Sequence, residues 1–309
     1  GNGGGGQGGP GGNSANNFLV NDKNGISTTH SLGINYTDKW GKNLDVTGSY
    51  FLNQGINKTM QTVHRDYLLA IDSGQVYDES SNNTTNNINQ RFNLKMEWKI
   101  DSSNSILFIP KLSLQTNNAH SILNGNTIAN SILQSSTNNV NNTLTNAFNF
   151  SDDLLFRHRF KKRGRTFSVT LTTGLNGSNS ENDLHAANNY FRSDTTTSRI
   201  IDQESKISKK GSNIGGNFMY TEPLGEKGTI VANYTNNYQF TSNDKKTKSY
   251  PQADYLNNYN PALSSTFDNS YITNKGGLGY RFNTRTIQLM ASVNYQQSIL
   301  HSDQSYPYQ

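Results

Sequence analysis

Histidine and carboxylate side chains are the first candidates for chemistry in this chain of 309 residues, because they serve as acid–base catalysts and metal ligands. None of the six histidines stands at the HxxxH or HxH spacing of a local metal site, and the chain has no cysteine. His64-Arg65-Asp66 stands without the rest of a kinase signature, and Asp152-Asp153 is typical of solvated turn residues. We therefore expect no enzyme, no metal and no cofactor, although a hydrolase site assembled from separate strand ends is not excluded by spacing.

Two further segments could bind anions. The basic run Arg157–Arg165 (RHRFKKRGR) suits nucleic acid, but its position in a tight turn favours contact with anionic lipid headgroups. Residues 1–17 are rich in glycine, yet no GK[ST] follows them and no strand precedes them, so a phosphate-binding loop is disfavoured. We expect residues 1–28 to be a linker or loop, and residues 29–309 to form the folded part.

The composition does not suit an ordinary soluble domain. Hydrophobic residues make up 32% and charged residues 16%, against roughly 45–50% (a count that includes glycine) and about 25% in typical domains. Aromatic residues reach 10% and the net charge is only +5, which is unlike classical disorder. No apolar run approaches the ~18 residues of a membrane-spanning helix. The pattern of the apolar residues therefore matters more than their number.

Apolar and polar residues alternate with period 2, which indicates strands with one apolar face. The clearest run is residues 88–100, where Phe92, Leu94 and Met96 alternate with Asn93 and Lys95. Strands are expected at 29–38, 44–52, 88–100, 106–115, 148–160, 167–172, 214–220, 230–234, 278–282 and 287–295. Pro110 cannot donate a ladder hydrogen bond, so a bulge is predicted there.

The connections are of two kinds. Tight turns recur about every 61 residues, and they centre on Gly41, Ser103, Gly164, Gly225 and Thr284. Between the hairpins lie stretches rich in Asn, Ser and Thr with little periodicity, at about 53–87, 116–146, 176–211 and 240–270. We expect long loops there, which count against a soluble sandwich, because its connections are short at both ends.

Short turns that alternate with long loops predict an outer-membrane β-barrel. The expected fold is all-β: an antiparallel transmembrane β-barrel section of about ten strands in five hairpins, with short periplasmic turns and long extracellular loops. A periplasmic girdle of aromatic residues is predicted near the short turns: Tyr36, Trp40, Trp98, Phe160, Phe167, Tyr220, Tyr280 and Phe282. The opposite parity carries candidates for lumen-facing charges: Lys95, Glu97, Lys99, Lys111, Arg157, Arg159 and Arg281. These charges suit either an anionic solute or plain solvation of the lumen.

Several stretches also resemble a known family. NGISTTHSLGINYTDKWGKN (Asn24–Asn43) and FNFSDDLLFRHRFKKRGRTFSVTLTTGLN (Phe148–Asn176) resemble the large outer-membrane β-barrels of Bacteroidetes related to TonB-dependent receptors. So do Ile100–Asn118, YTEPLGEKG (Tyr220–Gly228) and GGLGYRFN (Gly276–Asn283). The resemblance implies a parent barrel of about twenty-two strands with a plug and a TonB-contact segment. This chain shows neither, so we expect it to be a middle section of the barrel.

Three functions remain open at this point. The first is solute uptake across the outer membrane, with the plug domain and the TonB system supplied by other parts of the parent chain. The second is a non-transporting anchor or assembly subunit whose large loops bind surface lipoproteins or other outer-membrane subunits. The third is a soluble or secreted β-rich adhesin. Outer-membrane lipid is the expected environment for the first two, and nucleic acid is not an expected partner.

Overall fold

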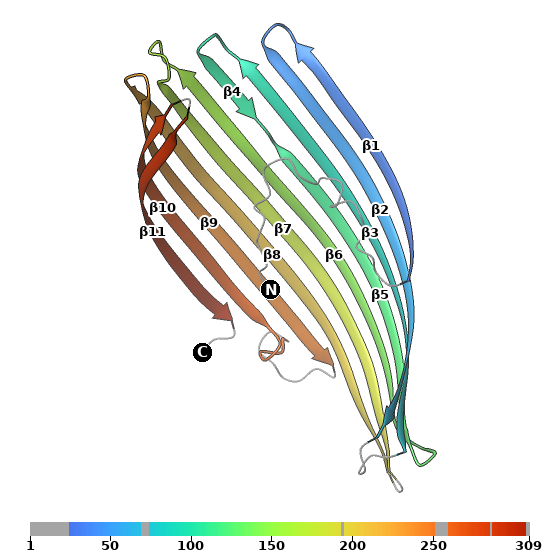
Figure 1. The fold of residues 1–309 in the computed structure, drawn as a ribbon. Helices are drawn as coiled ribbons and strands as arrows, with labels where there is room; N and C mark the ends of the chain where they lie inside the picture. The colour runs from blue at the N-terminus through green and yellow to red at the C-terminus, as the bar shows by residue number, and fades with distance from the viewer. Residues whose placement is uncertain (1–24, 69–73, 193–194, 251–258, 285, 307–309) are drawn as a thin grey trace.

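A computed structural model describes residues 25–68, 74–192, 195–250, 259–284 and 286–306, so the predicted linker lies almost entirely outside the described residues. The described chain is all-β and forms one antiparallel sheet of eleven strands (Figure 1). The strands are β1 (Ile26–Trp40), β2 (Leu44–Tyr67), β3 (Gln75–Lys99), β4 (Asn104–Phe108), β5 (Lys111–Ala129), β6 (Ile132–Arg159), β7 (Thr166–Arg192), β8 (Thr195–Leu224), β9 (Gly228–Tyr250), β10 (Ser265–Asn283) and β11 (Gln288–Tyr306). The predicted fold class is confirmed, although β1 begins inside the segment expected to be a linker.

β4 and β5 are two pieces of one strand, and both lie between β3 and β6. The break falls at Ile109 and Pro110, but the pairing continues in one register on both sides of it. Backbone hydrogen bonds bridge the gap, from Ile109 N to Asp153 O at 2.9 Å and from Leu94 N to Pro110 O at 3.0 Å. The prediction of a bulge was therefore wrong: Pro110 removes a donor without inserting a residue.

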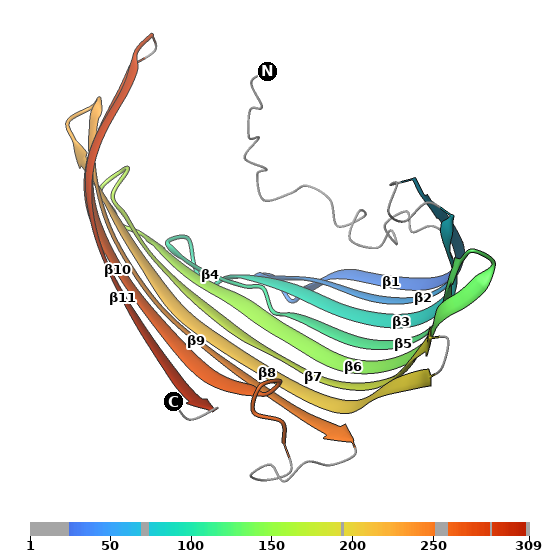
Figure 2. The same ribbon diagram turned by 90° about the horizontal axis from the view of Figure 1, so that it is seen from below.

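The sheet is curved into an open trough (Figure 2). With β4 and β5 counted as one strand, every strand pairs with its neighbours in the chain, and β1 and β11 form the two edges. Among the described residues neither edge strand has a partner on its outer side. Each edge therefore presents a row of backbone N–H and C=O groups that could pair with a further strand.

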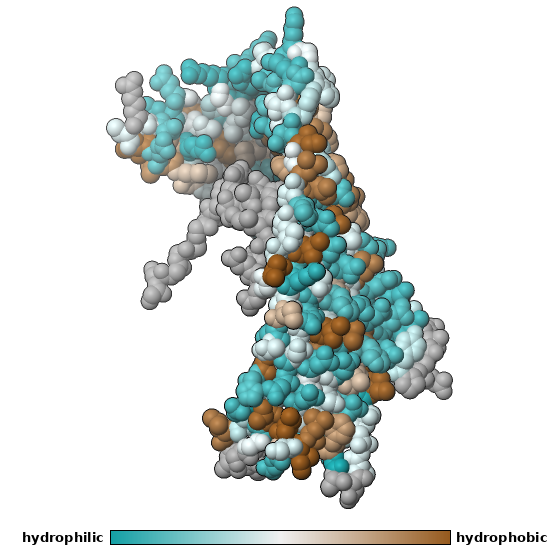
Figure 3. Space-filling model, turned by 90° about the vertical axis from the view of Figure 1, so that its right-hand side faces the viewer, coloured by the Kyte–Doolittle hydropathy of each residue, from teal (hydrophilic) through white to brown (hydrophobic). Residues whose placement is uncertain are grey.

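The sheet encloses no hydrophobic core. Val46 and Ala186 are the only buried hydrophobic residues among those described. The chain exposes 21303 Å², whereas a compact monomer of its mass would expose about 13,000 Å². Hydrophobic residues accordingly lie open among hydrophilic ones over the surface drawn in Figure 3. Such a sheet needs something other than its own interior to cover its apolar side chains.

The short turns lie where the sequence predicts them. β1 and β2 are joined through Gly41, β6 and β7 through Gly164, and β8 and β9 through Gly225. All three glycines have positive φ, of 69°, 86° and 67°, a backbone conformation that other residues rarely adopt. The turn before β4 is held by Asp101, whose Oδ1 accepts the backbone N–H of Ser103 at 2.6 Å.

The predicted long loops were wrong, because most of their residues continue the strands. β6 has 28 residues and β8 has 30, against the ~9–11 that cross a bilayer. β5 and β6 meet in a tight turn at Asn130 and Ser131, which have positive φ of 52° and 63°. The extensions are mainly polar on both faces, so they lack the period-2 signal, yet backbone pairing continues along them.

Candidate functional site on the two faces of the sheet

Register assigns each side chain to a face, because directly opposite residues of an antiparallel pair point to the same side. On β7 the residues of one face are crowded: Gly174 and Ala186 are buried. On the other face Leu171 and Leu175 are exposed, at 43% and 51%. Curvature brings side chains together on the inside of a trough, so the face of Gly174 and Ala186 is the concave face.

All seven charged residues predicted to face a lumen share this concave face. Asp45 opposes Glu97 and Ser105 opposes both Lys99 and Arg157, which fixes their common side. The pairing places the remaining four on the same side: Lys95, Lys111, Arg159 and Arg281. Whether a water-filled lumen lies over this face stays a prediction.

Four of the seven residues gather at one place. Glu97, Lys99, Arg157 and Arg159 line an open groove of about 570 Å³ near the short turns of β3 and β6. Arg159 donates from Nη2 to the carbonyl oxygen of Ser102 at 2.5 Å. Lys95, Lys111 and Arg281 do not line this groove and stand apart on the same face. The groove could attract an anion, since three of its four charged strand residues are cationic.

Lys99 and Lys39 share one carboxylate beside this groove. The Nζ atoms of Lys99 and Lys39 lie 3.6 Å and 3.8 Å from the Asp45 carboxylate. These pairs are exposed, so each adds little to stability. The two pairs link β1, β2 and β3 through Asp45. Arg157 and Arg159, the other two cations of the groove, have no acidic partner among the described residues.

The eight aromatic residues of the predicted girdle share the opposite, convex face. Trp40 opposes Leu44, which opposes Trp98, and this row continues through Ile106, Phe156, Val169, Phe218 and Tyr234. The other members lie near the same ends of their strands: Tyr36, Phe160, Phe167, Tyr220, Tyr280 and Phe282. Four of the eight are more than 40% exposed: Tyr36, Trp40, Trp98 and Tyr280.

Apolar residues extend from this row along the convex face and form a band. On β6 it runs from Phe148 to Phe160, which at ~3.3 Å per residue and a tilt of ~40° covers about 30 Å. Its interruptions are hydrogen-bonded: Asp152 accepts from Thr173, and His158 Nδ1 lies 2.7 Å from Asn104 Oδ1. We call the part of the sheet from the short turns through this band the banded half, and the strand extensions the polar half.

Several titratable side chains of the polar half form pairs across neighbouring strands. Among the described residues no three His, Cys, Asp or Glu side chains are placed to hold a metal ion. His64 Nδ1 lies 2.5 Å from Asp78 Oδ1, and Nε2 lies 3.4 Å from Asp66. The hydrogen bond to Asp78, aided by the charge of Asp66, raises the pKa of His64. Sequence reasoning missed this contact because Asp78 lies on the next strand.

Ion pairs of the polar half lie on its convex face. Lys206 Nζ is 3.3 Å from Glu204 and 3.4 Å from Glu181 on the neighbouring strand, and both carboxylates raise the pKa of Lys206. The concave face beside them is formed mainly by amides and hydroxyls. Asn182, for example, donates to Asn141 Oδ1 and Thr143 Oγ1, each at 2.8 Å.

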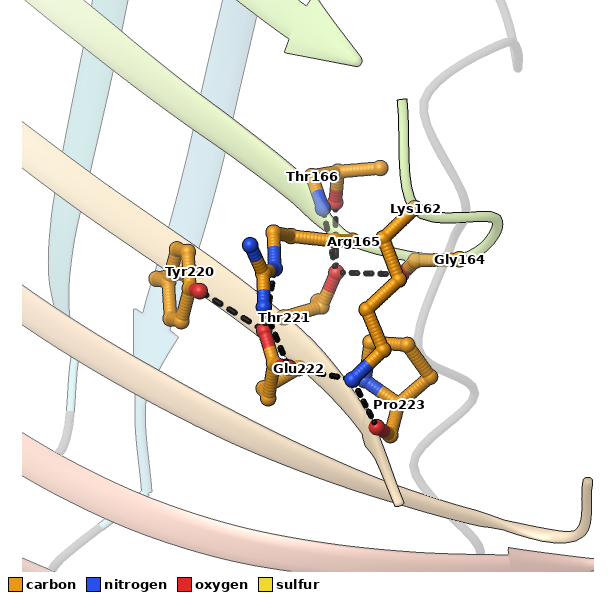
Figure 4. Close-up of polar contacts among 8 residues, drawn as sticks. All are labelled: Lys162, Gly164, Arg165, Thr166, Tyr220, Thr221, Glu222 and Pro223. Atoms are coloured by element: carbon orange, nitrogen blue, oxygen red, sulfur yellow. Dashed lines mark hydrogen bonds and ion pairs between the residues drawn. The ribbon is translucent and has the colours of Figure 1, made fainter. Parts of the chain in front are cut away.

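One cluster at the end of the banded half has partners that sequence reasoning missed. Glu222 of β8 accepts from Arg165 Nε at 2.6 Å, Arg165 Nη2 at 2.8 Å and Lys162 Nζ at 2.6 Å (Figure 4). Tyr220 Oη donates to the same carboxylate at 2.7 Å. The basic run was visible in the sequence, but its acidic partner lies 57 residues further along the chain.

Within the described residues no helix is long and apolar enough to cross a bilayer. Neither a comparison with protein-family models nor a comparison with curated proteins yields a match for this chain.

Proposed function

We propose that the chain is a section of an outer-membrane β-barrel of the kind found in TonB-dependent receptors of Bacteroidetes, and that this barrel takes up a solute. The observation that carries the proposal is the division of the banded half: aromatic and aliphatic side chains on the convex face, charges on the concave face. A lipid bilayer would cover the convex band, which the chain itself leaves exposed. An aqueous lumen would solvate the concave charges.

The two unpaired edges support the same placement. An open edge is costly in lipid, because its N–H and C=O groups have no partner there. The proposed barrel therefore requires further strands against β1 and β11, each alternating apolar and polar residues in step with its neighbour. In this arrangement the short turns face the periplasm and the polar half projects from the cell surface.

A register experiment tests the membrane placement. Leu94→Arg places a charge on the convex band, whereas Asn93→Arg places it on the concave face one residue away. We expect Leu94→Arg to impair insertion into lipid vesicles by about 2–4 kcal/mol and Asn93→Arg to be tolerated. Insertion is read as heat-modifiable mobility on gels. Equal tolerance of the two variants would defeat the membrane assignment.

Solute uptake predicts a selective path along the concave face. In planar bilayers with a KCl concentration gradient, we expect the closed barrel that contains this chain to conduct chloride in preference to potassium. Arg157→Gln together with Arg159→Gln should shift the reversal potential towards zero, because these two residues are the unpaired cations of the groove. An unshifted reversal potential would count against a role for the groove in conduction.

A second candidate function is favoured by the strand extensions. The polar half rises roughly 40 Å beyond the band at ~3.3 Å per residue and a tilt of ~40°, and it is a paired sheet. A rigid polar wall of this kind suits an anchor that presents a surface to lipoproteins or other outer-membrane subunits. Insertion without any conductance in the same recordings would favour this function over uptake.

A further inference from the structure

The turn between β6 and β7 differs in charge from the other short turns. Its segment carries six cations and no acid between Arg157 and Arg165. The first turn mixes Asp38, Lys39, Lys42 and Asp45, the second has Lys99 and Asp101, the fourth has Glu226 and Lys227, and the fifth has Arg281 and Arg285. The turn between β6 and β7 therefore carries the largest positive charge of the five.

Two of the cations in this turn form contacts that hold it in place. Lys162 and Arg165 bind Glu222, and Lys162 also donates to the carbonyl oxygen of Pro223 at 3.0 Å (Figure 4). Thr221 Oγ1 adds a hydrogen bond to the carbonyl oxygen of Gly164 at 3.1 Å. These contacts attach the turn to the end of β8 and hold it in place.

Two other cations remain available. Lys161 and Arg163 are exposed, and among the described residues neither has a hydrogen-bond or ion-pair partner. They belong to the same turn as Arg165, whose guanidinium lies 5.8 Å from the centre of the Phe160 ring. The ring of Phe160 in turn lies edge-on to the ring of Tyr220, with 6.3 Å between the ring centres. The two free cations thus belong to a turn that also carries Phe160, at the end of the convex band.

We propose that this turn binds the phosphate headgroups of anionic phospholipids in the inner leaflet of the outer membrane. Aromatic side chains of this kind favour the headgroup level, and cations close to a membrane surface attract anionic lipid. The bracing by Glu222 holds Lys161 and Arg163 beside the band, where a headgroup would lie above acyl chains that cover Phe160. This inference rests on the proposed membrane placement, which it extends to a preference for lipid charge.

The absence of cysteine allows a local test of this preference. Val169→Cys in the full chain, labelled with an environment-sensitive fluorophore, reports from the convex band near this turn. The protein is inserted into phosphatidylcholine vesicles that contain either brominated phosphatidylglycerol or brominated phosphatidylcholine as quencher. We expect phosphatidylglycerol to quench several-fold better at low salt, and less so at high salt.

Lys161→Gln together with Arg163→Gln should bring the quenching ratio close to one, because each cation near a membrane surface contributes about 1 kcal/mol of attraction to anionic lipid. The matched control, Lys42→Gln with Lys227→Gln, removes the same charge from two mixed turns and should leave the ratio unchanged. A ratio near one in heat-modifiable wild-type protein, or an equal fall in the control, would overturn the headgroup site alone. Failure of the wild type to insert into either kind of vesicle would overturn the membrane placement and this site together.

Discussion

The banded half and the polar half belong to the same strands, but different interactions determine their sequences. In the banded half each strand alternates, so that one face is apolar and the other carries charge. In the polar half both faces are hydrophilic, and amides and hydroxyls bond across strands, as Gln54 does with Asn86 at 3.2 Å and Thr137 with Asn188 at 2.9 Å. Strand pairing thus needs only backbone partners, whereas apolar and polar residues alternate where the two faces of the sheet meet different surroundings.

The largest expected effect is the difference between an arginine placed in the banded half and one placed in the polar half, on the same strand and the same face. Phe156 and Leu144 both lie on the convex face of β6, the first in the band and the second beside Glu181. Phe156→Arg should cost about 2–4 kcal/mol of insertion, because the proposed placement puts the charge in lipid. Leu144→Arg should insert normally, as measured by heat-modifiable mobility in vesicles. Similar losses in both variants would abolish the distinction between the halves.

The next prediction separates paired strands from loops in the polar half. Asn141→Pro removes a backbone donor from β6, which is paired on both sides, and should cost about 1–3 kcal/mol there. Hydrogen exchange should show slow amides at 132–146 in the wild type and loss of that protection in the variant. Asn141→Ala keeps the backbone donor and loses only the side-chain acceptor for Asn182, so it serves as the control that separates the two effects. Fast exchange of the wild-type segment would mean that these residues form loops after all.

A smaller effect is expected from the amide network of the concave face. Asn182→Ala removes both donated hydrogen bonds from β7 to Asn141 and Thr143 of β6 and should destabilise the pairing of β6 with β7 by about 1 kcal/mol. Asn179, on the same strand, has no side-chain hydrogen bond among the described residues, so Asn179→Ala should change stability little. The opening free energies from hydrogen exchange measure both. Equal costs would show that the network does not stabilise the polar half.

The smallest effect concerns pH at the tip of the β2–β3 hairpin. The pKa of His64 is raised in the folded state by Asp78, so its contribution is complete below the ordinary pKa of ~6.5 and is lost as pH rises through the raised value. An NMR titration of the imidazole should show the raised pKa, and amide exchange near residue 64 should speed up over that pH range. Asp78→Asn should return the pKa towards its ordinary value. A wild-type pKa at or below that value would refute the pairing.

Sequence reasoning predicted the banded half well, because alternation and glycine turns are local signals. It located the short turns and put the aromatic and the charged residues on opposite parities. It failed at Pro110, where the missing donor suggested an inserted residue that the register does not contain. It also failed in the polar half, where Asn, Ser and Thr give no alternation and therefore no signal for a strand.

Which residues alternate, where the chain turns sharply and how low the apolar fraction is can all be read from the sequence alone. The continuation of the strands through the polar segments, the gathering of four charged residues in one groove and the fixing of the basic turn by Glu222 depend on the assembled sheet. The physical reason is range: alternation and turns depend on residues close in the chain. Pairing partners such as Arg165 and Glu222, 57 residues apart, are brought together only by the register of the assembled sheet.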